Sequence, residues 1–286
     1  MPELPEVETV RRGLQPALEG ARLVRVRVNR PDLRFPFPEG FMERLQGARV
    51  DVLERRAKYL LARLDRGETW VTHLGMTGRF VVEAGLNARA LGEFVTAAST
   101  DEKHAHLVIE TDGGARVTFF DARRFVYMGL LPTAELPEHP WFKGLGPEPL
   151  GPEFGADVLK RAFAGRKQNV KATLLDQRVV AGLGNIYVVE ALHRARLSPN
   201  KPAGKVSAPA LARLAEAVPE VLEAAIAAGG STLRDYAQAD GSLGYFQHSF
   251  SVYGREGEPC PRNDGGEVRR IVQAGRSTFF CPACQR

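Results

Sequence analysis

The sequence predicts an α+β protein with two domains, in which a β-rich domain with one leading helix precedes a helical domain and a small cysteine-bearing hairpin. Three observations support this prediction. Alternating apolar and polar residues are typical of the first half, helical periodicity is typical of the second half, and a proline-dense stretch separates them. With 286 residues, the chain is long enough for two domains that each bury a core.

The first domain is predicted to begin with a helix. Pro5 suits a first helical turn, and Val7, Val10 and Leu14 then recur at helical spacing. Residues 22–28 alternate apolar and basic side chains, which is typical of a half-buried strand. Further strands are expected at 59–64, 69–74, 107–111 and 116–120.

The proline-dense stretch carries six prolines from Pro132 to Pro152, a density that interrupts both helix and sheet and indicates a linker. Beyond it, apolar residues between Leu211 and Ala225 follow one face of a helix. The predicted segments are a β domain, a proline-rich linker, a helical domain and a terminal hairpin, at residues 1–131, 132–156, 157–250 and 251–286.

The charge balance favours a polyanionic partner, although a basic protein surface exposed to solvent would give the same values. The formal net charge is +5 and the isoelectric point is about 9.2. No apolar run approaches the roughly 18 residues of a membrane span. The first residues are partly acidic and show no signal-peptide pattern. We therefore expect a cytoplasmic protein.

The N-terminal residues suggest nucleophilic chemistry. Pro2 follows the initiator methionine, whose removal would expose a secondary amine that titrates near pH 8, about two units below lysine. Such an amine attacks a sugar C1′ to give an iminium, with Glu3 beside it to move protons. Glu6 follows on the same helical face, where it would orient the first turn or tune the amine. An ordinary helix start with acidic residues remains the alternative reading.

The run PELPEVET, followed by Arg11-Arg12-Gly13-Leu14, resembles the opening of formamidopyrimidine-DNA glycosylases. The resemblance continues in order along nearly the whole chain. It implies a bifunctional enzyme that removes oxidised purines from duplex DNA, built as an N-terminal β-sandwich with a leading helix. A helix–two-turn–helix domain and a zinc-ribbon-like β-hairpin follow in that family. The resemblance also implies a monomer in the bacterial cytosol, associated with the nucleoid when it is bound to DNA.

Several residues of the first domain match functional positions of that family. By resemblance, Lys58 contacts DNA and assists catalysis, and His104 contacts a phosphate. Met76 and Arg123 fill the gap left by an extruded base, and Phe125 wedges the neighbouring step. Taken alone, the lysine is more typical of a solvated strand edge, and the methionine and phenylalanine are more typical of core residues. Two departures, Ala122 for proline and Val126 for glycine, affect the shape of this loop.

In the second domain, a Gly-x-Gly turn at 182–184 follows the expected helical run 171–178, and the next helix begins near Asn185. A helix start after such a turn is suited to a phosphate, although a plain helix–helix connection uses the same residues. By resemblance, Lys171 and Asn185 bind phosphates around the lesion and Lys167 is another DNA contact. The glycine-rich stretch 229–244 would close over the everted base.

The three cysteines all lie in the last 27 residues, at Cys260, Cys281 and Cys284. The second and third form a C-x-x-C pair suited to tetrahedral zinc. The resembled family has two such pairs, and the first is broken here, because Asn263 takes the place of its second cysteine. Asp264 is the preferred fourth ligand over Asn263. A water ligand or a metal-free hairpin are the alternatives. Arg276, on the hairpin between the cysteines, matches a family arginine that reaches the phosphates. In that family the DNA strand is cut by a β- and then a δ-elimination, and this arginine serves the second.

The resemblance, together with these residues, thus implies a DNA glycosylase and abasic-site lyase for 8-oxoguanine and formamidopyrimidines, with one structural zinc ion. Two alternatives stay open at this point. The first is the same chemistry on oxidised pyrimidines, as in the endonuclease VIII branch, which typically departs from the pattern just after the first glutamate. The second is a paralogue that binds damaged DNA without cutting it, which the degenerate cysteine motif favours and the presence of Pro2, Glu3 and Lys58 disfavours.

Overall fold

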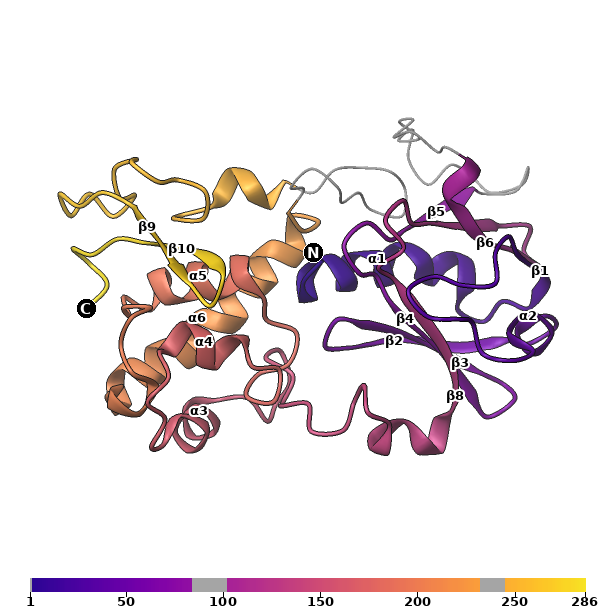
Figure 1. Cartoon of the computed structure of the whole chain (residues 1–286), viewed down its shortest axis with the longest axis horizontal. Coiled ribbons are helices and arrows are strands. Elements are labelled where there is room, and N and C mark those ends of the chain that lie inside the picture. Colours follow the sequence, from indigo (N-terminus) through magenta and orange to yellow (C-terminus); the bar gives the residue numbers. More distant parts are fainter. Residues whose placement is uncertain (1, 84–101, 232–244) are drawn as a thin grey trace. The chain divides into compact units, whose positions relative to one another are not determined.

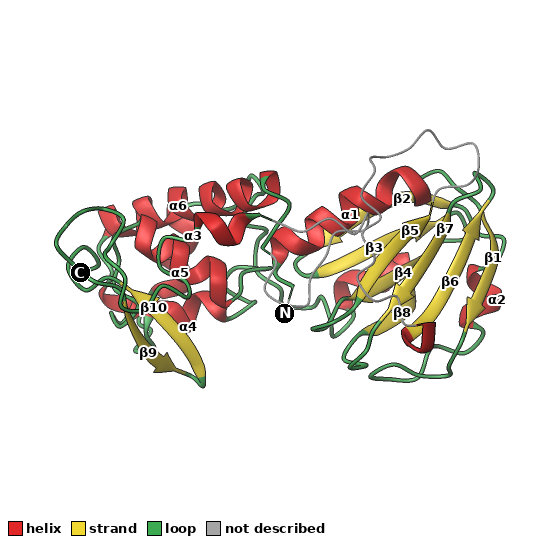
Figure 2. Ribbon diagram, turned by 90° about the horizontal axis from the view of Figure 1, so that it is seen from above, coloured by secondary structure: helices red, strands yellow, loops and turns green. Residues whose placement is uncertain are grey.

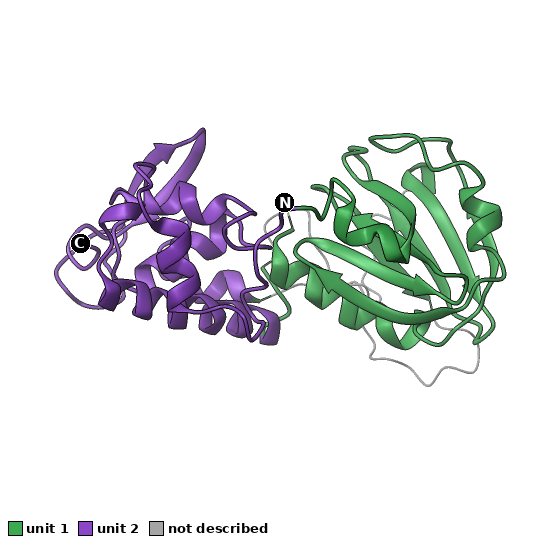
Figure 3. Ribbon diagram, turned by 90° about the horizontal axis from the view of Figure 1, so that it is seen from below, with its two compact units in different colours: residues 1–143, 228–245 green, residues 144–227, 246–286 purple. Residues whose placement is uncertain are grey.

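The chain forms two compact units, which are coloured separately in Figure 3. The computed structural model describes residues 2–83, 102–231 and 245–286. Unit 1 comprises Met1–Lys143 and Ala228–Tyr245, and unit 2 comprises Gly144–Ala227 and Phe246–Arg286. The change between the units therefore falls inside the predicted proline-rich linker, and the chain returns once to unit 1. Most of the glycine-rich stretch expected to close over a base lies outside the described residues.

Unit 1 contains two four-stranded antiparallel sheets packed as a sandwich, as the sequence predicts (Figure 2). Apolar side chains from both sheets form one continuous core, including Phe119 of the first sheet and Trp70 of the second. The first sheet has the order β1 (Leu23–Val28), β6 (Ala105–Thr111), β7 (Arg116–Phe120) and β5 (Arg79–Glu83). The second has the order β2 (Val50–Arg56), β3 (Tyr59–Leu64), β4 (Glu68–His73) and β8 (Tyr127–Pro132).

The leading helix α1 (Leu4–Leu18) covers the edge of the sandwich, because it contacts β2 and β3 of one sheet and β5 of the other. Its predicted apolar face is buried, with Val7, Val10 and Leu14 at most 1% exposed. Each such side chain contributes roughly 1.5–3 kcal/mol of burial free energy. The short helix α2 (Phe41–Leu45) packs against β1. The core therefore fixes the position of the helix start, where the predicted nucleophile lies.

Unit 2 is helical, with α5 packed on both α4 and α6. The predicted apolar face of the last helix is buried, from Leu211 to Ala225. The helical run expected over 171–178 ends earlier, because the side chain of Asp176 accepts the backbone N–H of Arg178 at 3.1 Å and starts a turn. The helices are α3 (Ala156–Phe163), α4 (Val170–Leu175), α5 (Asn185–Arg194) and α6 (Ala208–Ala227).

The chain ends in the predicted hairpin, formed by β9 (Arg269–Gln273) and β10 (Arg276–Phe280) (Figure 1). Its turn residues Ala274 and Gly275 both have positive φ, at 48° and 72°, as a two-residue type I′ turn requires. The turn exposes Arg276 at the start of β10. Short 3-10 helices complete the fold, η1 (Glu102–His104), η2 (Thr133–Glu138), η3 (Ala203–Lys205) and η4 (Phe246–Ser249). Within the described residues, no helix has the length and apolar character of a membrane span.

Candidate active site and metal centre

The start of α1 holds Pro2 and Glu3 in a fixed, buried position. A reciprocal capping box joins the first turn, in which the Glu3 side chain accepts the backbone N–H of Glu6. In return, the Glu3 backbone N–H donates to Glu6 Oε2 at 2.8 Å. Both carboxylates are nearly inaccessible, at 3% and 2% exposure. Glu6 therefore orients the first turn, which is one of the two roles that the sequence left open for it.

The other oxygen of Glu6 reaches a distant part of unit 1. Glu6 Oε1 accepts hydrogen bonds from the backbone N–H and the hydroxyl of Ser231, at 2.9 and 3.0 Å. Ser231 in turn pairs with Tyr245 in an isolated β-bridge. One buried carboxylate thus connects the helix start to the residue that precedes the stretch 232–244.

Lys58 lies in the two-residue turn between β2 and β3, and it is buried to 7% exposure. Ala57 before it adopts the left-handed region, with φ of 52°. Near Lys58, burial lowers the pKa of His73 to about 4, and the charges of Lys58 and Arg34 act in the same direction. His73 Nδ1 accepts the Gly75 N–H at 3.1 Å, so the neutral ring carries its hydrogen on Nε2. His73 is therefore a neutral hydrogen-bond donor near Lys58, the lysine that is predicted to assist catalysis.

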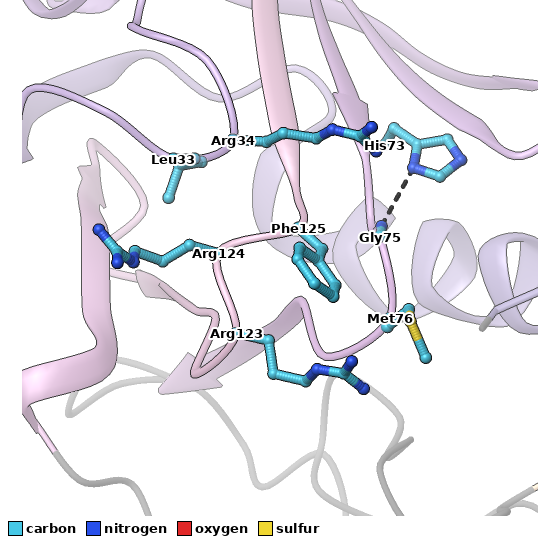
Figure 4. A pocket seen from close by; sticks show the side chains of 8 residues that line it. All are labelled: Leu33, Arg34, His73, Gly75, Met76, Arg123, Arg124 and Phe125. Atoms are coloured by element: carbon cyan, nitrogen blue, oxygen red, sulfur yellow. Dashed lines mark hydrogen bonds between the residues drawn. The ribbon is translucent and has the colours of Figure 1, made fainter.

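The structure brings Met76, Arg123 and Phe125 to one hollow of about 620 Å³ on unit 1 (Figure 4). Met76 and Phe125 are exposed to 37% and 41%, which excludes the reading of these two residues as core. The Arg123 guanidinium lies 4.8 Å from the centre of the Phe125 ring, in a cation–π contact. The hollow is lined by Leu33, Arg34, His73, Gly75, Met76, Arg123, Arg124 and Phe125.

The buried carboxylate of Asp121 holds together the two loops that carry these side chains. Its Oδ1 accepts the hydroxyl of Thr77 at 2.5 Å and the N–H of Arg123 at 3.2 Å. Its Oδ2 accepts the N–H of Val126 at 3.0 Å. Asp121 itself is 0% exposed. The loops therefore depend on one carboxylate that satisfies three donors.

Two glycines let these loops approach each other. Gly75 has φ of +60°, and a Cβ there would lie 2.6 Å from the carbonyl of Phe125. A Cβ at Gly78 would lie 2.4 Å from Val126 Cγ2. Val126, which departs from the family pattern, is fully buried, so its side chain packs under the loop.

In unit 2, the predicted phosphate contacts Lys171 and Asn185 both bond to the hairpin. Lys171 is 0% exposed, and its Nζ donates to Ser277 O at 3.1 Å and to Thr278 Oγ1 at 2.6 Å. Asn185 Nδ2 donates to the same Ser277 carbonyl at 3.0 Å. These two side chains thus position the strand that begins with Arg276. Lys167 is exposed, and its contact with DNA stays a prediction.

The four predicted metal ligands lie together at the base of the hairpin. One donor atom from each of Cys260, Asp264, Cys281 and Cys284 lies within 4.8 Å of the others. The sulfurs of Cys260 and Cys284 are 4.0 Å apart, and Cys281 Sγ is 3.7 and 3.6 Å from the two Asp264 oxygens. Adjacent ligands of tetrahedral zinc are roughly 3.8 Å apart, since Zn–S bonds are near 2.3 Å. The donor set therefore fits zinc, which supplies a structural cross-link.

The backbone turns Asp264 toward the sulfurs. Asn263 and Gly265 on either side adopt the left-handed region, with φ of 52° and 74°. The N–H of Gly266 donates to Asp264 Oδ1 at 2.8 Å and lowers the pKa of that carboxyl. Burial raises the pKa of the Cys284 thiol, so a cation is needed to hold that sulfur as a thiolate.

Family models match the chain in three consecutive parts. Residues 1–128 match the formamidopyrimidine-DNA glycosylase N-terminal domain, and residues 145–237 match the H2TH domain of the same enzyme. Residues 257–286 match the zinc finger found in FPG and IleRS. The chain belongs to the formamidopyrimidine-DNA glycosylase family. The curated relatives include a formamidopyrimidine-DNA glycosylase of Phenylobacterium zucineum, 64% identical, and one of Caulobacter vibrioides, 60% identical, with full coverage of both chains.

Solved structures of formamidopyrimidine-DNA glycosylases share this fold. The MutM (Fpg) protein of Thermus thermophilus superposes with a TM-score of 0.83 at 41% identity, over 99% of this chain and 98% of that one. A Lactococcus lactis Fpg variant in complex with DNA that contains Fapy-dG superposes with a TM-score of 0.85 at 32% identity, over 100% of both chains. Both the predicted family and the predicted fold class are therefore confirmed.

Three residues that organise the candidate active site and the metal centre were not predicted from the sequence: His73, Asp121 and His193. His73 ends a strand directly before the turn that carries Met76, and that position is the signal that was available. Asp121 opens the loop of Arg123, but its three acceptor roles depend on contacts that sequence does not show. His193 lies on α5 beside the metal ligands and has no sequence signal.

His104, the predicted phosphate contact, is partly exposed at the end of η1. His106 is buried, and its Nε2 donates to Asp121 O at 2.8 Å.

Proposed function

We propose that the protein is a base-excision repair glycosylase that removes oxidised purines, such as 8-oxoguanine and formamidopyrimidines, from duplex DNA and then cuts the strand as an abasic-site lyase. The observation that carries this proposal is the buried start of α1, where the capping box of Glu3 and Glu6 fixes Pro2. The relatives of this chain are named formamidopyrimidine-DNA glycosylases, which supports the glycosylase activity. The Lactococcus lactis relatives in complex with DNA that contains Fapy-dG or an abasic site support damaged DNA as the partner.

The proposed chemistry starts after removal of Met1, which converts the Pro2 nitrogen from an amide into a secondary amine. The amine attacks C1′ of the damaged nucleotide, a C1′–N bond to Pro2 forms, and the bond from C1′ to the base breaks. Glu3 moves protons to and from the sugar ring, and Lys58 assists. The C1′–O4′ bond then breaks, with the ring oxygen taking a proton from Glu3, which gives an iminium between Pro2 and C1′. The iminium withdraws electrons, so loss of a C2′ proton expels the 3′ phosphate. A second elimination, served by Arg276, expels the 5′ phosphate and leaves a one-nucleotide gap.

The same proposal assigns the DNA contacts. Met76 and Arg123 occupy the gap in the stack after the base is extruded, and Phe125 wedges the adjacent step, which agrees with the exposure of these side chains on one hollow. The phosphate contacts are assigned to His104, Lys167, Lys171 and Asn185. Because these contacts displace counterions, affinity falls steeply with salt concentration. We place the protein in the bacterial cytoplasm as a monomer.

Lesion preference separates this proposal from oxidised-pyrimidine repair. Excision is compared on duplexes that contain 8-oxoguanine opposite cytosine and thymine glycol opposite adenine. The proposal predicts faster release of the purine, and faster release of thymine glycol would contradict it.

Strand cutting separates the enzyme from a binding-only paralogue. The proposal predicts that an abasic-site duplex is cut to products with phosphate at both ends of the gap, and that Pro2→Gly lowers the yield strongly. Tight binding of the lesion duplex without any base release or strand cleavage would support the binder instead.

A further inference from the structure

A buried histidine lies beside the metal centre at the end of α5. His193 is 3% exposed, and its Nε2 is 3.5 Å from the sulfur of Cys260, which is 2% exposed. Neither the glycosylase chemistry nor the proposed DNA contacts use this side chain. A buried imidazole N–H needs an acceptor, since desolvation without one is unfavourable.

The contact belongs to a larger connection between the metal-binding loop and the helix end. Arg262, two residues after Cys260, donates from Nη2 to the carbonyls of His193 and Arg194, at 3.3 and 3.0 Å. Those carbonyls lie in the last turn of α5, where a cation is favourable. The loop thus contacts the helix end through Cys260 and Arg262 together.

The geometry favours a hydrogen-bonding role for His193 over direct coordination. The donor atoms that lie within 4.8 Å of one another come from Cys260, Asp264, Cys281 and Cys284, and they already supply four ligands. A distance of 3.5 Å between Nε2 and Sγ suits an N–H to thiolate contact. Three thiolates and a carboxylate bring more negative charge than the divalent cation neutralises, so a donor to one sulfur is stabilising.

We propose that the Nε2–H of His193 donates a hydrogen bond to the zinc-bound thiolate of Cys260, and that it positions this ligand in a centre where Asp264 replaces a sulfur. His193 acts through Cys260 and is a positioning residue. Glu190, one turn earlier on α5, accepts the N–H groups of Ser251, Val252 and Tyr253 at 2.9, 3.0 and 2.8 Å. The same helix therefore holds the chain before Cys260 through Glu190, and the chain after it through the carbonyls that accept from Arg262.

The test compares two substitutions at this position in the full-length protein. His193→Phe fills the space without a donor, and His193→Gln keeps an amide N–H. Val189→Ala is the matched control, since Val189 is a buried residue of the same helix and belongs to an apolar cluster with Val252 and Phe279. Zinc affinity is measured by competition with a chromophoric chelator, and thiolate-to-metal charge transfer is measured in cobalt-substituted protein.

The expected result for His193→Phe is a loss of zinc affinity of about 10- to 100-fold and a shifted charge-transfer band. His193→Gln restores most of both, and Val189→Ala leaves the cobalt spectrum unchanged. Unchanged affinity and spectrum in His193→Phe would overturn the proposal. None of these readouts uses DNA, so the result does not depend on the proposed glycosylase activity.

A measurement on the unsubstituted protein covers the case in which His193→Phe fails to fold. In the cadmium-113 form, a hydrogen bond to the metal-bound sulfur gives a small scalar coupling between cadmium and the imidazole Nε2–H proton. We expect that coupling. A large direct coupling between cadmium and the imidazole nitrogen would show that His193 is itself a ligand and would refute the donor role.

Discussion

Replacement of Asp121 by asparagine tests whether one buried carboxylate organises the loops of the candidate DNA-binding hollow. Asparagine has one acceptor oxygen where aspartate has two. If its amide nitrogen takes the place of Oδ2, the buried N–H of Val126 faces a donor, and if it takes the place of Oδ1, the N–H of Arg123 does. An unsatisfied buried donor costs about 1–3 kcal/mol, so we expect Asp121→Asn to lower the free energy of unfolding of unit 1 by about 2 kcal/mol.

Tryptophan fluorescence during urea unfolding reports on the correct unit, because both tryptophans, Trp70 and Trp141, lie in unit 1. Thr77→Val is the matched control, since it keeps both Asp121 oxygens and removes the hydroxyl that donates to Asp121 Oδ1 and accepts the Arg123 N–H at 3.3 Å. It is expected to lower the free energy of unfolding by about 1 kcal/mol. The double variant should lower the free energy of unfolding by less than the sum of the two single effects, because the two groups contact each other. A free energy of unfolding for Asp121→Asn within roughly 0.5 kcal/mol of the native value would refute the reasoning.

Three further predictions concern other parts of the molecule. Burial lowers the pKa of His73 to about 4, so the unfolded chain takes up this proton first and stability falls between about pH 6.5 and 4, by roughly 1–3 kcal/mol. Urea midpoints at both ends of this range should differ less in His73→Gln. Asp264→Ala should weaken zinc binding at least roughly 10-fold in chelator competition, whereas Asn263→Gly, which suits the left-handed backbone, should leave it unchanged. Ser231→Ala should cost about 1 kcal/mol and speed amide exchange at residue 231, and unchanged exchange would contradict the link to Glu6.

Much of the fold was predictable because its elements have local signals. Strands β1, β3, β4, β6 and β7 follow from periodicity, and the structure confirms them within a residue or two at their ends. The leading helix is also confirmed, and it continues to Leu18, beyond the expected pattern that ended at Leu14. Strands β2, β5 and β8 were not predicted. The return of Ala228–Tyr245 to unit 1 also has no local signal, because it depends on contacts such as that of Ser231 with Glu6, 225 residues apart.

The site residues were predictable where the resemblance aligned them with functional positions of the family. They were less predictable where burial decides what a side chain contacts. Met76, Arg123 and Phe125 share one hollow, as the shared role requires. Lys171 shows the opposite case, since a lysine is expected at the surface and this one is fully buried against the hairpin. Its direct contact with a phosphate stays a prediction, and its observed bonds position the strand of Arg276.

The central claim is that the imino nitrogen of Pro2 forms a covalent iminium with the sugar of the damaged nucleotide. The most direct measurement reduces the reaction with an 8-oxoguanine duplex by borohydride, digests the trapped complex and locates the modified residue by mass spectrometry. The account predicts a sugar adduct on an N-terminal peptide that begins with Pro2. An adduct on Lys58 or another lysine, or full activity in protein that retains Met1, would contradict it.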